Sequence, residues 1–288
     1  MHIGAVFPQT EIGTDPGAIR TYAQSVEEMG YRHILIYDHV LGASTAKRPD
    51  WRGPYTSETL FHEPFVLFGY FAACTQQIEL VTGVIILPQR QTALVAKQAA
   101  EVDVLSGGRL RLGIGVGWNP VEFEGLNEDF GNRGARSEEQ IEVLRKLWTE
   151  PVVTFKGRWH QIDAAGIKPL PVQRPIPIWI GGGAEKVLER TARIGDGWFP
   201  QMPPDETARE AVQRLRAYAE AAGRDPNTIG IEARLSIGRV PESGWLAYVE
   251  GWRELGATHL SINTMDAGLR SPQEHIDALR HAKAVIGF

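Results

Sequence analysis

The sequence has little cysteine: Cys74 is the only one among 288 residues. A single thiol forms no internal disulfide, so the fold cannot depend on a disulfide framework, which suits a reducing compartment. Because Cys74 lies in an apolar stretch with helical periodicity, we expect a buried thiol. Long apolar runs are also missing, since none approaches the ~20 residues that span a bilayer, and no basic leader precedes the first strand pattern. We therefore expect a cytoplasmic protein without a membrane segment.

The sequence also lacks a strong excess of one charge. Its 30 Lys and Arg residues against 35 Asp and Glu residues give a formal net charge of −5, spread along the chain. Neither nucleic acid nor an anionic membrane is favoured as a partner, and a small-molecule ligand is the better expectation. Hydrophobic residues make up 43% of the chain, which is enough for a sizeable core and argues against disorder.

Short β-branched runs alternate along the chain with longer amphipathic segments, as expected when crossover helices join parallel strands. Eight strand–helix pairs can be counted. The predicted strands cover residues 2–7, 33–37, 79–87, 110–115, 176–180, 197–200, 229–237 and 259–262. The predicted helices cover residues 16–29, 64–75, 92–105, 135–148, 184–194, 205–222, 244–255 and 272–285.

Eight such pairs favour an α/β fold of the (β/α)8 TIM-barrel type over a doubly wound open sheet, because an open sheet of eight strands would need both edges covered. Residues 151–177 are irregular: two short strand patterns flank the turn signal Lys156-Gly157. We interpret them as a small hairpin insertion before the fifth strand. No internal repeat or linker divides the chain, so the simplest account is one domain over residues 1–288.

Active sites of enzyme barrels lie at the carboxyl ends of the strands, so the residues after each strand are the candidates. Asp38 and His39 follow the second strand. They are either an acid–base pair facing a reactive ring or a loop pair that caps backbone groups. A metal site is not favoured, because no second ligand lies at i+2 or i+4 and His62 and His160 fall in separate loops.

Glycines interrupt the third strand and follow the fourth. Gly83 and Val84 lie within the third strand, where a glycine marks either a functionless bulge or a place where a ligand approaches the backbone. After the fourth strand, Gly117 ends a run of three alternating glycines, and Trp118 and Asn119 follow. Glycines permit close approach and the Trp118 indole can line a planar ligand. The run lacks the G-x-G-x-x-G spacing of a dinucleotide site.

Gly181, Gly182 and Gly183 join the fifth strand to the next helix. Free N–H groups at a helix N-terminus bind anions, so these residues predict a phosphate site, with a flexible turn as the alternative. The Walker spacing and its lysine are absent. The four junctions together suit a phosphorylated cofactor with a planar, isoalloxazine-like ring.

Several phrases along nearly the whole chain resemble the luciferase-like monooxygenase superfamily. The short chain and Gly117-Trp118-Asn119 followed by Glu122-Phe123 resemble the branch that uses the deazaflavin coenzyme F-420 rather than flavin mononucleotide (FMN). The matching phrases are Tyr37-Asp38-His39, Thr82 to Pro88, Ala96 to Ala100, Leu105 to Arg109, Gly113 to Asn119, Pro177 to Gly183 and Gly195 to Trp198.

This resemblance implies hydride transfer between a deazaflavin and a small organic substrate, in a homodimer. It places the phosphate tail toward Gly182 and Gly183 and a non-prolyl cis peptide, which backs the ring in relatives, at Gly83-Val84. Asp38 and His39 map onto the pair that contacts the ring, with His39 as the catalytic acid–base or stabilising residue.

One position departs from the sugar-phosphate dehydrogenases of this superfamily, whose proton-donating acid is replaced here by Trp118. We therefore expect Trp118 to shape an apolar substrate pocket, beside Trp51 and Phe61. Glu122 is expected at the surface at a helix start, with supply of a carboxylate to the site as the alternative. For Trp198, core packing and contact with the cofactor are equally open.

Three other functions compete with the leading one. An FMN-dependent monooxygenase would need reduced flavin from a reductase partner and molecular oxygen. A flavin-binding barrel without catalysis would bind cofactor but turn over no substrate. A cofactor-free aldolase or hydrolase is disfavoured, because no strand end carries a lysine or paired metal ligands.

Overall fold

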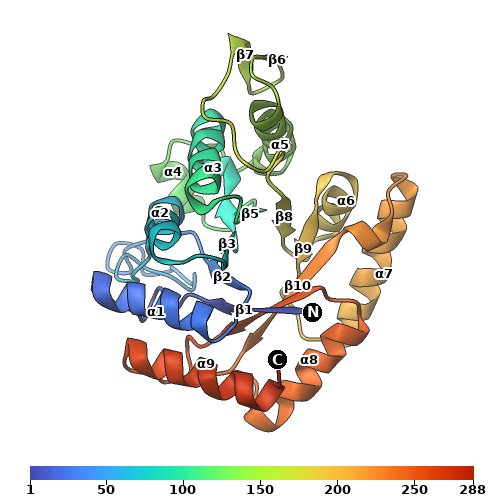
Figure 1. Cartoon of the computed structure of the whole chain (residues 1–288). Helices are drawn as coiled ribbons and strands as arrows, with labels where there is room; N and C mark the ends of the chain where they lie inside the picture. Colours follow the sequence, from blue (N-terminus) through green and yellow to red (C-terminus); the bar gives the residue numbers. More distant parts are fainter.

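The computed structural model describes residues 1–288. Eight parallel strands close into a barrel, because β3 pairs with β2 on one side and with β5 on the other, and β1 pairs with β11 (Figure 1). The (β/α)8 barrel predicted from the sequence is confirmed. The barrel strands are β1 (His2–Val6), β2 (His33–Ile36), β3 (Glu79–Thr82), β5 (Leu110–Gly115), β8 (Ile178–Gly181), β9 (Gly197–Phe199), β10 (Gly230–Ser236) and β11 (His259–Asn263).

Helices surround the strands, and the first and last of them lie side by side and bring the two ends of the chain together (Figure 1). They are α1 (Pro16–Glu28), α2 (Pro64–Cys74), α3 (Thr92–Ser106), α4 (Pro120–Gly125), α5 (Arg133–Thr149), α6 (Glu185–Ile194), α7 (Glu206–Ala221), α8 (Trp245–Glu254) and α9 (Pro272–Ile286). Short 3-10 helices cover Leu87–Gln89, Pro226–Thr228 and Glu242–Gly244. Eight of the nine helices match the predicted ones to within two residues at each end, and α4 was not predicted.

Local sequence explains where several helices begin. Asp15 accepts hydrogen bonds from the N–H groups at the start of α1, Glu63 caps α2 and Ser271 caps α9, each directly before a proline. Proline costs nothing at the first helical position, because its missing N–H would have no partner there. Cys74 ends α2 and is half-buried rather than buried.

The predicted hairpin insertion is present. Strands β6 (Val153–Lys156) and β7 (Gln161–Ala165) pair antiparallel and project from the barrel beside α5 (Figure 1). Glu139 on α5 holds the turn, because its carboxylate accepts the N–H groups of Arg158, Trp159 and His160.

The predicted third strand is divided in two. β3 ends at Thr82, the peptide bond between Gly83 and Val84 is cis, and β4 (Ile85–Ile86) continues the pairing with β5. The cis peptide implied by the family resemblance is thus confirmed. The divided strand exposes backbone at the carboxyl end of the barrel, where the site was expected.

The inside of the barrel contains a buried charged group and a small apolar cluster. At the amino ends of the strands, Arg111 lies 2.8 Å from Glu79 and 2.5 Å from Glu232, and His33 lies 2.8 Å from Glu232. Every charge in this buried group has a partner, which a buried ion network needs in order to be tolerated. The apolar cluster consists of Val6, Leu35, Val81, Trp179, Phe199 and Met265, and the Arg111 guanidinium lies 4.2 Å from the centroid of the Trp179 ring.

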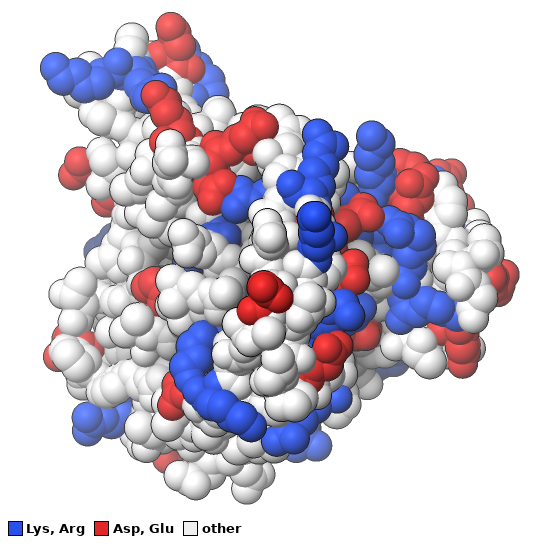
Figure 2. Space-filling view, turned by 90° about the horizontal axis from the view of Figure 1, so that it is seen from above, with Lys and Arg blue, Asp and Glu red and all other residues white.

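None of the helices combines the length and the apolar character needed to cross a membrane. Basic and acidic side chains are interspersed over the face of the molecule in Figure 2, so this face offers no extended surface of one sign.

Candidate active site

A pocket of about 380 Å³ opens at the carboxyl ends of the barrel strands. Its lining comes from the ends of β2, β3 and β9, from β10, and from the loops after β2 and β5. Residues separated by up to about 200 positions in the sequence therefore meet in one cavity. They are Tyr37, Asp38, Pro54, Tyr55, Gly83, Val84, Ile86, Trp118, Gln201 and Arg234.

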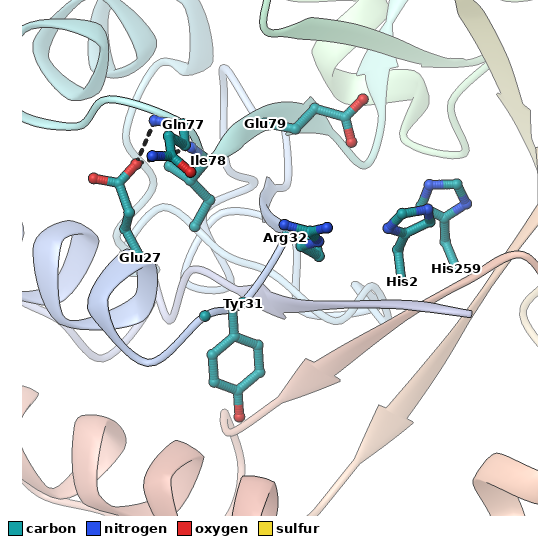
Figure 3. A pocket seen from close by; sticks show the side chains of 9 residues that line it. His2, Glu27, Tyr31, Arg32, Gln77, Ile78, Glu79 and His259 are labelled. Carbon is teal, nitrogen blue, oxygen red and sulfur yellow. Dashed lines mark hydrogen bonds between the residues drawn. The ribbon is translucent and has the colours of Figure 1, made fainter. Parts of the chain in front are cut away.

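A second cavity lies at the opposite, amino-terminal end of the barrel (Figure 3). The rings of His2 and His259 stack there at 5.0 Å, and Glu27 accepts backbone hydrogen bonds from Gln77 and Ile78. This end of a barrel usually serves stability, whereas catalytic groups lie at the other end. The pocket at the carboxyl end is therefore the candidate active site.

Val84 forms part of the wall of the pocket and is held by two glycines. A Cβ atom on Gly115 would lie 2.6 Å from the Val84 side chain, and one on Gly181 would lie 2.9 Å from it. Gly113 likewise leaves room for the Thr82 carbonyl, which a Cβ would approach to 1.9 Å. These glycines of β5 and β8 thus permit the close packing of the divided third strand.

The three predicted residues after β5 have different surroundings. Gly117 has a left-handed φ of +73°, and a Cβ there would lie 2.6 Å from Ile86. Asn119 is buried, and its side chain accepts the Val121 N–H at the start of α4 and donates to the Leu41 carbonyl. Only Trp118 lines the pocket; it is 45% exposed.

Aromatic rings surround the mouth of the pocket. The Trp118 ring centroid lies 5.8 Å from that of Trp51 and 6.3 Å from that of Tyr55, as expected for an apolar wall. Phe61 packs on Tyr55 at 4.7 Å and on His39 at 5.0 Å. The loop after β2 therefore supplies most of this wall.

Asp38 lines the pocket, but its carboxylate is engaged elsewhere. Arg90 donates to both of its oxygens, at 2.8 and 3.3 Å, and the Ile86 N–H donates at 3.0 Å. The Asp38 side chain is only 1% exposed. Asp38 therefore ties β2 to β4, the second half of the divided strand.

His39 is paired with Glu122. Its Nδ1 lies 3.0 Å from Glu122 Oε1, both side chains are less than 10% exposed, and the His39 Nε2 has no hydrogen-bond partner. His39 does not line the pocket and packs against Tyr55 and Phe61 beside it. The structure thus leaves one buried ring nitrogen free on a histidine whose other nitrogen is fixed.

The expectation that Glu122 lies at the surface is wrong: it is 2% exposed. Burial raises the pKa of Glu122. Hydrogen bonds from His39 and from the N–H groups of Val40 and Leu41 lower the pKa by more than burial raises it, so the net pKa is below its usual value. The helix-start position is correct, since Glu122 is in the first turn of α4.

The start of α6 carries free backbone donors. The N–H of Gly182 donates to the Phe199 carbonyl at 3.3 Å, whereas those of Gly183 and Ala184 donate to no acceptor, and no side chain caps the helix. The fully buried Trp198 donates from Nε1 to the Gly182 carbonyl at 2.7 Å. Trp198 is thus a core residue that fixes the loop, and the two free N–H groups suit an anion.

Arg234 and Gln201 line the pocket and were not predicted. Arg234 is on β10, and its guanidinium donates to the Tyr37 hydroxyl at 2.9 Å. It forms no ion pair with any carboxylate, since no acidic oxygen lies within 4.0 Å. No group of three or more His, Cys, Asp or Glu side chains is arranged to hold a metal.

The luciferase-like monooxygenase family profile matches residues 1–285. This chain belongs to the luciferase-like monooxygenase family. The family consists of flavin-type oxidoreductases and monooxygenases, so the coarse prediction of an enzyme of this class is confirmed.

Some proteins similar to this luciferase-like protein have names that state a cofactor and an activity, and others do not. An uncharacterized protein of Mycobacterium tuberculosis is 29% identical over 292 residues, covering 97% of each chain. The FMNH2-dependent dimethylsulfone monooxygenase of Pseudomonas fluorescens is 33% identical over 175 residues, covering 60% of this chain and 47% of the relative. The structure of an F420-dependent secondary alcohol dehydrogenase, in complex with an F420-acetone adduct, superposes with a TM-score of 0.79 at 17% identity, covering 100% and 99% of the two chains. The last similarity is one of fold.

Proposed function

We propose that this protein is a deazaflavin (coenzyme F-420)-dependent oxidoreductase that transfers a hydride between the coenzyme and a small organic substrate. The observation that carries the proposal is the pocket at the carboxyl ends of the strands, where Gly83 and Val84 line a cavity near a helix start with free N–H groups. Such a pocket suits a planar ring joined to a phosphate tail.

The residues present fit such a cofactor. The N–H groups of Gly183 and Ala184 would hold its phosphate, and Gly83 and Val84 would support its ring. The bound deazaflavin would supply a carbon that accepts or donates a hydride. Asp38 would act by holding the divided strand in position rather than by direct contact of its carboxylate, because Arg90 occupies both oxygens.

By the family resemblance, His39 would supply or take up a proton at Nε2, a nitrogen that is buried beside the pocket rather than part of its lining. Glu122, which is held in its ionised form, fixes the ring through Nδ1, so a proton on Nδ1 leaves the lone pair of Nε2 free. Tyr55 and Phe61 pack on the His39 ring and keep water from it. Hydrogen bonds to the ring are therefore stronger than they would be in water.

An FMN-dependent monooxygenase is the second candidate, supported by the 33% identity to the dimethylsulfone enzyme. The match covers only 47% of that relative. The fold is shared by F420-dependent enzymes and by monooxygenases, so the preference for the deazaflavin rests on the resemblance of Gly117-Trp118-Asn119 and Glu122-Phe123 to the F-420 branch. We keep one domain over residues 1–288 and a cytoplasmic homodimer as parts of the proposal; light scattering during gel filtration tests the dimer.

Parallel titrations of the purified protein with coenzyme F-420 and with FMN, followed by fluorescence and thermal shift, test the cofactor. We expect selective binding of the deazaflavin. Preference for FMN would move the conclusion to the monooxygenase, and binding of neither would refute the cofactor proposal.

Two substitutions at the start of α6 test the phosphate contact. Ala184 has a φ of −71°, which suits proline, so Ala184→Pro removes one free N–H without backbone strain. Because a hydrogen bond to a charged group contributes about 1.5–3 kcal/mol, we expect cofactor binding to weaken roughly tenfold to a hundredfold. Ala184→Gly is the matched control, because it changes the same residue, at the start of α6, and keeps its N–H. Equal affinities in the two variants would contradict the contact.

His39→Asn separates the enzyme from a non-catalytic flavin-binding barrel. We expect cofactor binding to be retained and turnover on a panel of alcohols and carbonyl compounds to be lost. Tight cofactor binding by the unmodified protein with no turnover on any member of the panel would favour the carrier.

A further inference from the structure

Arg234 is a largely buried cation without an acidic partner. Its guanidinium makes one side-chain hydrogen bond, to the neutral hydroxyl of Tyr37 at 2.9 Å. The acids nearest in the fold are already engaged: Glu232, two residues earlier on β10, is bound by Arg111 and His33, and Asp38 is bound by Arg90. An arginine carries five N–H donors in a fixed fork, so most of the donors of Arg234 are unused.

The unused donors of Arg234 face a cavity. Arg234 lines the main pocket and also a smaller one beneath it, together with Tyr37 and Gln201. Every buried guanidinium nitrogen of Arg234 has a hydrogen-bond partner. The nitrogens that lack a partner are therefore accessible and open to the pocket. Because Arg234 lies within β10, whereas Tyr55 and Trp118 lie in loops, the cation is at the inner end and the aromatic rings are at the mouth.

The rest of the lining near the mouth is apolar or aromatic: Pro54, Tyr55, Val84, Ile86 and Trp118. A ligand that complements this pocket carries an anionic group at one end and an apolar body at the other. A planar carboxylate matches the guanidinium fork, which binds its two oxygens side by side.

We propose that Arg234 and Tyr37 form a carboxylate-binding subsite at the inner end of the pocket, and that the substrate is a small organic carboxylate with an apolar body. This inference rests on the proposed function, since it names the substrate class for the same pocket. The other source of negative charge is the ring of the reduced cofactor, and the experiment separates the two.

The probes are benzoate and benzamide, which have nearly the same shape and differ in charge. Their binding is measured by calorimetry, and by the tryptophan fluorescence of the protein, to which the half-exposed Trp118 in the pocket contributes, with and without bound coenzyme. The variants are Arg234→Gln, which removes the charge, and Arg234→Lys, which keeps it without the fork. Arg239→Gln is the matched control, because Arg239 is 75% exposed, pairs with Asp266 and does not line the pocket.

We expect the unmodified protein to bind benzoate more tightly than benzamide by on the order of tenfold to a hundredfold, the effect of a charge-assisted hydrogen bond pair. Arg234→Gln should abolish this preference and leave benzamide binding unchanged. Arg234→Lys should keep part of it, and Arg239→Gln should keep all of it. The thermal midpoint of each variant shows that it is folded.

Several outcomes would overturn the subsite. Equal binding of the two probes by the unmodified protein would do so, as would a preference that survives Arg234→Gln or disappears in Arg239→Gln. If Arg234→Gln weakens coenzyme binding but leaves the benzoate preference intact, the arginine serves the cofactor ring instead. If no cofactor binds but the benzoate preference depends on Arg234, the carboxylate subsite stands and the proposed function fails.

Discussion

Glu122 offers the most direct test of how the loop after β2 is held beside the site. Its carboxylate accepts hydrogen bonds from the N–H groups of Val40 and Leu41 and from Gln89 Nε2, and contacts His39 Nδ1 at 3.0 Å. Glu122→Ala leaves all four donors without this acceptor. Val40 and Leu41 are about 40% exposed, so water can take the place of the carboxylate at their N–H groups. The donor groups of His39 and Gln89 are buried and would be left without a partner.

An unpaired buried donor costs about 1–3 kcal/mol, so Glu122→Ala should lower the free energy of unfolding by about 2–5 kcal/mol. Glu122→Gln is the matched control. The amide oxygen of the new side chain can accept the hydrogen bonds that the carboxylate accepted from the loop. If the Gln89 amide rotates by 180°, its Oε1, which has no partner in the unmodified protein, can accept a hydrogen bond from the new NH2 group. We expect it to cost only about 1 kcal/mol.

Urea unfolding at neutral pH, followed by tryptophan fluorescence, measures both changes. If Glu122→Ala were as stable as the unmodified protein, or Glu122→Gln as damaged as Glu122→Ala, the hydrogen-bond argument would be refuted.

Two further predictions concern other buried groups. Asp38→Asn should reduce the free energy of unfolding by about 2 kcal/mol, because Arg90 loses a buried acidic partner and keeps only Glu63; an unchanged urea midpoint would show that Glu63 suffices. Burial lowers the pKa of His259 to about 3, from 6.5 in the unfolded chain, so its neutral form stabilises the fold fully above pH 6.5 and this contribution is lost as the pH falls toward 3. His259→Asn should therefore reduce the loss of stability between pH 7 and pH 5 by ~1–2 kcal/mol, and an equally steep urea-monitored loss in the variant would contradict this.

The sequence predicted the fold well because its signals are local. The ends of the helices follow from side chains such as Asp15 and Ser271, which act within one turn, and the strands follow from runs of β-branched residues. The cis peptide at Gly83-Val84 was expected from the family resemblance and is present. Periodicity could not predict that the third strand is divided there, because β4 is only two residues long.

The candidate site was predicted less completely, because its contacts join distant segments. The pairing of His39 with Glu122 links residues 83 positions apart, and the pattern of α4 does not indicate which of its faces is buried. Arg234 had an unused signal: on β10, Glu232, Arg234 and Ser236 alternate with apolar residues. In a barrel strand such an alternation places one set of side chains inside, so polar residues in that set indicate a buried network or a ligand contact.

Glu232 and Arg234 show how these two cases can be separated. Both face the inside of the barrel from the same strand, two residues apart. Burial raises the pKa of Glu232, but ion pairs and hydrogen bonds with His33, Arg111 and Ser261 outweigh it, so the net pKa is far below its usual value. Arg234 has only a neutral phenol. Removing an unpaired cation from water costs free energy, so a fold that needed only stability would gain little from an arginine there. The charge is more simply explained by a ligand that completes the pair, which makes the pocket at the carboxyl end of the barrel the place where the substrate is recognised.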